Sequence, residues 1–171
     1  YHRFNEIKYP STNTQIPIFK EHIQMIKSSG FEFLNPKLLS ELFYIEKPEK
    51  KFLLTVDDGY SSFYKHAWPY LLENEVPFLI FISTEAVGKN GYMNWEQIKE
   101  IEKESFAFIG NHSHSHEYLL EFGIDEFKND ILKSIGIFKK NLGYNPIFFS
   151  YPFGEFSLKH TSFIKKFFKY G

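Results

Sequence analysis

Cysteine is absent from this chain of 171 residues, which excludes disulfides, thiolate zinc sites and cysteine nucleophiles. Arginine is nearly absent too, because Arg3 is the single arginine among 20 basic residues. The 21 acidic residues bring the net charge to −1, so no basic field exists to hold a nucleic acid or an anionic membrane surface. Apolar runs such as Val76–Ile82 are far shorter than the roughly 20 residues of a membrane span. We therefore expect neither a nucleic-acid partner nor a membrane span.

Aromatic residues are abundant and make up 20% of the chain, with 21 Phe and 11 Tyr. Together with a hydrophobic fraction of 43%, this composition supports a packed core and argues against disorder. The length suits one domain. The chain begins at Tyr1 without a methionine and stops at Gly171 in mid-pattern. We therefore expect a single domain over residues 1–171 that is truncated at both ends.

Helical and extended patterns alternate along the chain, which favours an α/β fold over an all-α or all-β fold. The segments that we expect to be helical are Ile18–Ser29, Pro36–Phe43, Ser62–Asn74, Asn94–Glu104, Ile124–Leu142 and a last helix from about Lys159. The expected strands are Lys51–Val56, Phe78–Ser83, Phe106–Ile109 and Ile147–Tyr151.

Unusual polar residues follow three of these strands. They are the segments Asp57-Asp58-Gly59, His112 to His116, and Ser150 to Gly154. In a parallel α/β barrel or open sheet, the loops after the strands share one face, and that face holds the active site. We therefore predict a distorted, incomplete β/α barrel with parallel strands, in which these three loops meet.

The histidine cluster places three of the seven histidines at alternate positions, as His112, His114 and His116. If the segment begins a helix, His112 and His116 lie four residues apart on one face and can chelate one ion, while His114 points elsewhere. A solvated polar loop explains the cluster equally well, since a histidine-rich run is only a compositional hint.

The adjacent Asp57 and Asp58 are two of only four aspartates among the 21 acidic residues. A carboxylate after a strand often caps a following helix. Two adjacent carboxylates, however, repel each other unless a cation or strong donors lie nearby. A divalent ion held by one aspartate and two histidines relieves the repulsion and keeps coordination positions open for water and substrate. The second aspartate is then free to act as a base.

These residues resemble the polysaccharide deacetylases, the NodB-homology group of carbohydrate esterases. Thr55-Val56-Asp57-Asp58-Gly59 is similar to that family's T-F-D-D-G signature, and the His112–His116 segment fits its H-[ST]-x-x-H pattern. Tyr151-Pro152-Phe153-Gly154 is similar to the third motif. The context of this last motif most resembles the branch that acts on poly-N-acetylglucosamine.

The resemblance implies a role for each matching position. Asp57 would be the catalytic base, Asp58, His112 and His116 the metal ligands, and the backbone N–H near Phe153 the donor to the oxyanion. Ser113 would brace the histidine loop. Tyr151, Pro152 and Tyr60 would contact substrate, although Tyr60, like Trp68 and Trp95, is also explained as packing.

The activity that the resemblance implies is hydrolysis of N-acetyl groups on an amino-sugar polymer such as poly-N-acetylglucosamine, chitin oligomers or peptidoglycan. Zinc is the expected metal, with cobalt or nickel as alternatives, and the family favours an extracytoplasmic or cell-envelope location. Two rival interpretations stay open: a metal-dependent amidohydrolase of a small amide, and an inactive carbohydrate-binding relative. Ser150 stands where many members have an arginine, and the family's general acid is expected beyond Gly171.

Overall fold

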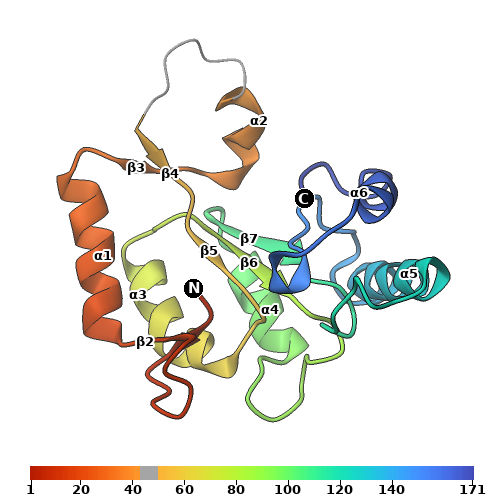
Figure 1. Ribbon diagram of the computed structural model, residues 1–171. Coiled ribbons are helices and arrows are strands. Elements are labelled where there is room, and N and C mark those ends of the chain that lie inside the picture. Colours follow the sequence, from red (N-terminus) through yellow and green to blue (C-terminus); the bar gives the residue numbers. More distant parts are fainter. Residues whose placement is uncertain (43–49) are drawn as a thin grey trace.

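Three parallel strands form the centre of the molecule (Figure 1). The computed structural model describes residues 1–42 and 50–171. Strands β5 (Thr55–Val56), β6 (Phe78–Ile82) and β7 (Ala107–Asn111) pair side by side in that order. Every residue of β6 is buried, which is typical of a parallel strand covered on both faces. The prediction that these strands are parallel is therefore confirmed.

Further segments extend this sheet on both sides. Beyond β7, Asn111 and Phe149 form a parallel bridge, and Phe148 and Tyr170 form the next. At the opposite edge, the N–H of Asp57 donates to the carbonyl oxygen of Tyr1 at 2.8 Å. Neighbouring segments thus follow the order of the sequence, as in an incomplete β/α barrel.

Two of the expected strands differ from the structure. The segment Lys51–Val56 is divided into β4 (Lys51–Phe52) and β5, because β4 pairs with β3 (Glu32–Phe33) whereas β5 pairs with β6. The segment Ile147–Tyr151 contributes only the two single bridges. The chain then enters a 3-10 turn, η3 (Pro152–Gly154). A further short pair, β1 (Arg3–Phe4) and β2 (Asn13–Thr14), precedes the first helix.

The helices lie around the outside of the strands (Figure 1). The α-helices are α1 (Ile16–Ser28), α2 (Leu39–Leu42), α3 (Trp68–Glu73), α4 (Trp95–Glu102), α5 (Ile124–Leu142) and α6 (Leu158–Ile164). A 3-10 turn, η1 (Pro36–Leu38), leads into α2. Of the expected helix Pro36–Phe43, only Phe43 lies outside the described residues.

The predicted helix Ser62–Asn74 is interrupted. Its first part is a π-helical turn, η2 (Phe63–Ala67), and only the second part is α-helical, as α3. Pro69 lies at the start of α3 and has no N–H to continue the ladder of the preceding turn, and such a break is accommodated by one wider turn. The structure thus corrects this prediction at the proline.

Local sequence signals do fix other helix ends. The side chain of Asn94 accepts a hydrogen bond from the N–H of Gln97, and the Gln97 side chain accepts one from the N–H of Asn94. This capping box satisfies two of the donors at the start of α4. Gly143 ends α5 with a φ of 84°, a left-handed conformation that glycine adopts without strain.

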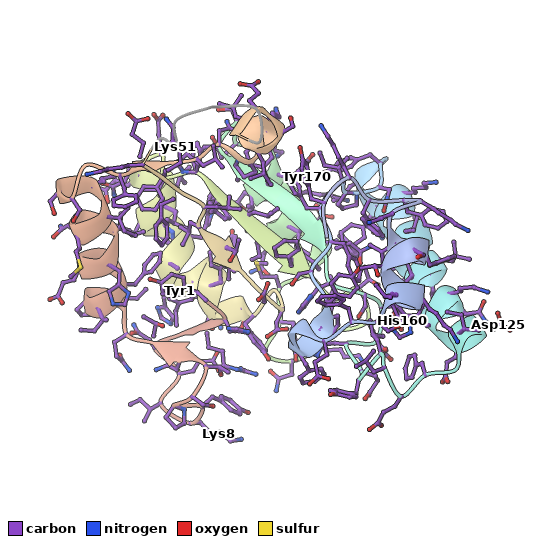
Figure 2. The ribbon with its side chains drawn as sticks, turned by 45° about the horizontal axis from the view of Figure 1, so that its top comes forward. Tyr1, Lys8, Lys51, Asp125, His160 and Tyr170 are labelled. Carbon is purple, nitrogen blue, oxygen red and sulfur yellow. The ribbon has the colours of Figure 1, made fainter. Side chains whose placement is uncertain are left out.

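The apolar side chains form two main cores. The larger packs β5, β6 and β7 against α1, α3 and α4, and the smaller joins α5, α6 and the segment around Phe149. Figure 2 shows this interior, with Tyr1 between α1 and the strands and His160 on α6. In the second core His160 packs on Phe127 of α5, with a ring-centroid distance of 4.2 Å. None of the helices within the described residues is long and apolar enough to cross a membrane.

Candidate active site

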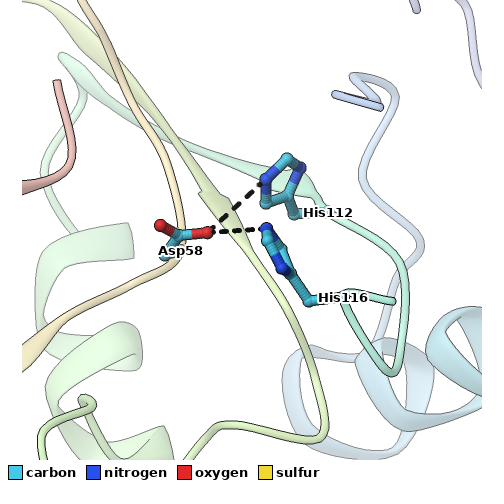
Figure 3. A group of neighbouring side chains, drawn as sticks. All are labelled: Asp58, His112 and His116. Atoms are coloured by element: carbon cyan, nitrogen blue, oxygen red, sulfur yellow. Dashed lines mark ion pairs between the residues drawn. The ribbon is translucent and has the colours of Figure 1, made fainter. Parts of the chain in front are cut away.

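Three side chains from two loops meet at the carboxyl ends of the central strands (Figure 3). Asp58 follows β5, and His112 and His116 follow β7. Oδ1 of Asp58 lies 3.0 Å from Nε2 of His116 and 3.6 Å from Nε2 of His112. Asp58 and His112 are buried and His116 is partly exposed. The group is therefore accessible to solvent at His116.

The atoms of this group suit a divalent cation. Nδ1 of His112 lies 2.8 Å from the carbonyl oxygen of Ser150 and must donate to it, because a carbonyl oxygen only accepts. Nε2 of a neutral His112 then points its lone pair at the Asp58 carboxylate, and two facing acceptors need a cation between them. Ligands at about 2.1 Å from a tetrahedral ion lie about 3.4 Å apart. The two observed spacings lie on either side of that value.

Burial and neighbouring charges shift the pKa values of all three side chains. Burial lowers the pKa of His112, which keeps this imidazole neutral and able to bind a metal. Burial raises the pKa of Asp58, but the hydrogen bond from His116 and the charges of the two histidines outweigh it, so the net pKa is lowered. Burial lowers the pKa of His116, but the hydrogen bond to Asp58 and the charge of its carboxylate outweigh this effect, so the net pKa of His116 is raised. Asp58 is thus held as a carboxylate.

Several residues of the site loops have backbone conformations that residues other than glycine rarely adopt. Six described non-glycine residues have a positive φ, and four of them are Asp58, Ser113, His116 and Phe153. Strained backbone of this kind is concentrated at functional sites. The segment His112–His116 is therefore a loop and not the start of a helix, so the two histidines converge for a different reason than their spacing of four residues.

Hydrogen bonds inside the protein hold this histidine loop in place. Oγ of Ser113 accepts the N–H of His116 at 3.1 Å, and Oδ1 of Asn111 accepts the N–H of Ser113 at 2.9 Å. The expectation that Ser113 braces the loop is confirmed. His114 points away from the group, since its Nδ1 lies 2.9 Å from Oγ1 of Thr84; this expectation is also confirmed.

Asp130 of α5 is a positioning residue that the sequence analysis did not identify. Its buried carboxylate accepts the N–H of His114 at 2.8 Å with one oxygen and the N–H of Ser115 at 2.9 Å with the other. The sequence did contain a sign of this role, because Asp130 is a charged residue on the apolar face of α5 that also carries Phe127 and Ile131. A buried carboxylate needs such partners, and here they fix the loop between the two histidines.

Asp57 lies beside the group of three but outside it. Its side chain keeps 25% of its surface exposed, and its Oδ2 is 3.8 Å from Nε2 of His2. The sequence analysis assigned His2 no role, because nothing in the spacing along the chain connects it to Asp57. Pairing of the first residues with β5 brings the two together.

The aromatic residues near the site differ in their surroundings. Tyr60 is partly buried; its ring lies 4.8 Å from that of Tyr92 and 3.4 Å below the guanidinium of Arg3. Tyr60 is therefore part of a packed stack. Trp68 packs on Phe78 and Trp95 packs on Phe138, so packing explains these two residues.

The third motif lies at the same edge. Pro152 is buried in η3 and has little surface to offer a ligand, whereas Tyr151 is partly exposed and packs edge-on against Phe149 at 4.9 Å. The ring of Phe153 is exposed and lies 5.1 Å from that of His116. The three polar loops that follow the strands therefore meet at one face, as predicted.

A cavity of about 180 Å³ opens beside the group, lined among others by Asp58, Ser83, Glu85, Lys89 and His116. A larger cavity of about 400 Å³, lined by Lys103, Ala107 and Tyr144, lies at the amino end of β7, away from these side chains. Catalytic metal sites have three protein ligands and keep one coordination position open, whereas structural metal sites are closed. Three protein donors with a cavity beside them therefore match a catalytic metal site better than a structural one. The fold and site thus define a β/α-barrel protein with side chains suited to a divalent metal.

The sequence profile of the polysaccharide deacetylase family matches residues 44–167, and the chain belongs to this family. The family resemblance given by the three motifs is therefore confirmed. The structure of IcaB from Ammonifex degensii superposes with a TM-score of 0.89 and 26% identity, covering 98% of this chain and 78% of that one.

Two curated relatives indicate the range of this family. The chain is 33% identical to the peptidoglycan-N-acetylglucosamine deacetylase of Bacillus cereus over 103 residues, which is 60% of this chain and 36% of that protein. It is 22% identical to the poly-beta-1,6-N-acetyl-D-glucosamine N-deacetylase of Escherichia coli K12 over 116 residues, 58% of this chain and 17% of that protein. The chain spans half or less of the length of its curated relatives.

Proposed function

We propose that this chain is the catalytic domain of a metal-dependent deacetylase that hydrolyses the N-acetyl groups of an amino-sugar polymer. The observation that carries the proposal is the group Asp58, His112 and His116 with the separate carboxylate of Asp57 beside it. A protein that only binds sugar has no need of a carboxylate next to a metal site. Membership of the polysaccharide deacetylase family supports the same reaction.

Asp58, His112 and His116 would hold the metal. Zinc suits two imidazoles and one carboxylate in a tetrahedral arrangement, and cobalt or nickel accepts the same donors. A bound ion supplies Lewis acidity, which polarises the acetamide carbonyl and makes water more acidic. The bond from His112 to the Ser150 carbonyl orients the imidazole, a second contact that metal-binding histidines commonly make.

The other groups of the site would move protons and stabilise charge. Asp57 takes a proton from the water that attacks the acetamide carbon. The N–H of Phe153 has no hydrogen-bond partner among residues 1–42 and 50–171, so it is free to donate to the oxygen on which negative charge develops. When the C–N bond breaks, the amine nitrogen must receive a proton.

His2 is a candidate for delivering that proton. Nε2 of its imidazole lies 3.8 Å from Oδ2 of Asp57. The carboxylate that takes a proton from water and the imidazole that would give one to the amine therefore lie side by side. The general acid expected beyond Gly171 stays a prediction. His2 adds a candidate for this role within the described residues.

The relatives whose names specify a polymer act on peptidoglycan or on poly-beta-1,6-N-acetylglucosamine. We therefore propose an N-acetylated amino-sugar polymer as the substrate of this chain as well. A small amide is the alternative to be tested.

Substitutions in the aspartate pair separate the base from the ligand. We expect Asp57→Asn in the full-length protein to keep the metal bound and to lose about 10²–10⁴-fold in rate, the usual contribution of a general base. Asp58→Asn should lose both metal and activity, because its oxygen belongs to the metal-binding group. Acetate release from an N-acetylglucosamine oligomer at fixed added zinc measures the rate, and metal analysis measures occupancy.

Asp125→Asn is the control, since Asp125 is an exposed residue paired with Lys128 on α5. Near-normal turnover by Asp57→Asn would refute the base assignment. Faster acetate release from a simple acetamide than from the oligomer would favour the small-amide alternative.

A further inference from the structure

Two large aromatic side chains are exposed beside the site. Phe153 keeps 62% and Phe156 keeps 58% of its surface exposed. Phe153 also has a φ of 60°, a conformation that is strained for a bulky residue. Strained backbone and an exposed phenyl ring are both unfavourable for folding, and clustered exposed aromatics mark binding surfaces. We therefore expect the side chain of Phe153, as well as its N–H, to have a function.

Ring contacts link these residues to the candidate metal ligands. The ring of Phe153 lies 5.1 Å from that of His116 and 5.6 Å from that of Tyr118. The ring of Phe156 lies 5.3 Å from that of Tyr151. We call Tyr118, Tyr151, Phe153 and Phe156 the aromatic rim. It comes from the two loops that follow β7 and Phe149, so it is continuous with the site and extends away from it.

The carboxylate of Glu155 lies beside this rim. The hydroxyl of Tyr118 donates a hydrogen bond to the carboxylate of Glu155. Within residues 1–42 and 50–171, no lysine or arginine forms an ion pair with Glu155, although the chain has 19 lysines. The rim thus combines aromatic faces with a hydrogen-bond acceptor, the Glu155 carboxylate. Sugar rings have apolar C–H faces and hydroxyl donors at their edges, which match such a surface.

We propose that the aromatic rim binds the sugar ring next to the one that loses its acetyl group, with Phe156 and Tyr118 as the residues that distinguish a polymer from a single sugar. The inference rests on the proposed function, since it takes the amino-sugar chain as the ligand. It assigns a role to two residues outside the motifs that define the family resemblance. A neutral or amine-bearing sugar fits the rim better than an anionic one, because Glu155 would repel a negative charge.

Binding is the measurement that tests the rim separately from catalysis. In the full-length Asp57→Asn protein, calorimetry would compare N-acetylglucosamine with its β-1,4- and β-1,6-linked pentamers. We expect at least one pentamer to bind more tightly than the single sugar. Phe156→Ala and Tyr118→Ala should each reduce the ratio of pentamer to monosaccharide affinity by about 2- to 10-fold, the usual effect of losing one aromatic contact.

Two further variants serve as controls. Tyr118→Phe keeps the ring and should change the ratio by less than about twofold. Phe167→Ala removes a phenyl ring that is also exposed but packs on Phe163, outside the rim, and should leave the ratio unchanged.

Pentamers that bind no more tightly than the monosaccharide, or a ratio unaffected by Phe156→Ala and Tyr118→Ala, would overturn the proposal. Acetate release from the pentamers by the unsubstituted protein is followed separately. A protein that binds pentamers through the rim but releases no acetate with zinc, cobalt or nickel would refute the proposed function and not the rim.

Discussion

Asp130 provides a sharp test of how the fold holds the site, because it contacts the histidine loop through the backbone and takes no part in the group of three donors. In Asp130→Asn, one carboxylate oxygen becomes an NH₂ group. The Asp130 carboxylate accepts hydrogen bonds from the backbone N–H groups of His114 and Ser115. In the variant, one of these two N–H groups faces the new NH₂ group, which is another donor. The substitution keeps the size of the side chain, so its effect isolates hydrogen bonding and charge.

The magnitude follows from the two hydrogen bonds. A bond to a charged group contributes about 1.5–3 kcal/mol, and leaving a buried donor unpaired costs about 1–3 kcal/mol. Losing one bond and weakening the other should lower the free energy of unfolding by about 2–4 kcal/mol. For a domain of this size that corresponds to a fall in Tm of roughly 4–16 °C. A displaced loop should also weaken metal binding by about 10–100-fold.

Thermal unfolding and zinc titration of the full-length protein measure the two effects. Asp125→Asn is a matched control, because Asp125 lies on the same helix and pairs with Lys128 at its exposed surface; such pairs contribute about 0.3–0.5 kcal/mol. If Asp130→Asn and Asp125→Asn behaved alike in both assays, the positioning role of Asp130 would be wrong.

Two other substitutions test local features. His112→Ala should abolish stoichiometric metal uptake, whereas His114→Ala should leave it largely intact because this ring bonds elsewhere; equal metal content in the two variants would contradict the assignment. Gly110→Ala should destabilise the protein by about 1–3 kcal/mol, since a methyl group there would lie 2.4 Å from the ring of Phe81. Denaturant unfolding measures this effect, and an unchanged midpoint would show that the ring can move aside.

The sequence predicted features that depend on neighbouring residues. The ends of α4 and α5 follow from Asn94 with Gln97 and from Gly143, whose hydrogen bonds and backbone conformation are local. The three polar segments were identifiable because each follows an apolar run of strand length. Parallel pairing then brings their ends together whatever the details of the loops. The family, the fold class and the convergence of Asp58 with two histidines could therefore be predicted from the sequence.

Tertiary structure alone decided the features that depend on distant residues. The division of Lys51–Val56 into β4 and β5 depends on which neighbour each half pairs with, and no local pattern specifies that. His2 and Asp57 are far apart in the chain and meet only because the first residues pair beside β5. Asp130 is one charged residue on a helix until the histidine loop folds over it. The sequence determines which groups can carry out the chemistry, whereas packing between distant segments decides which of them come within bonding distance.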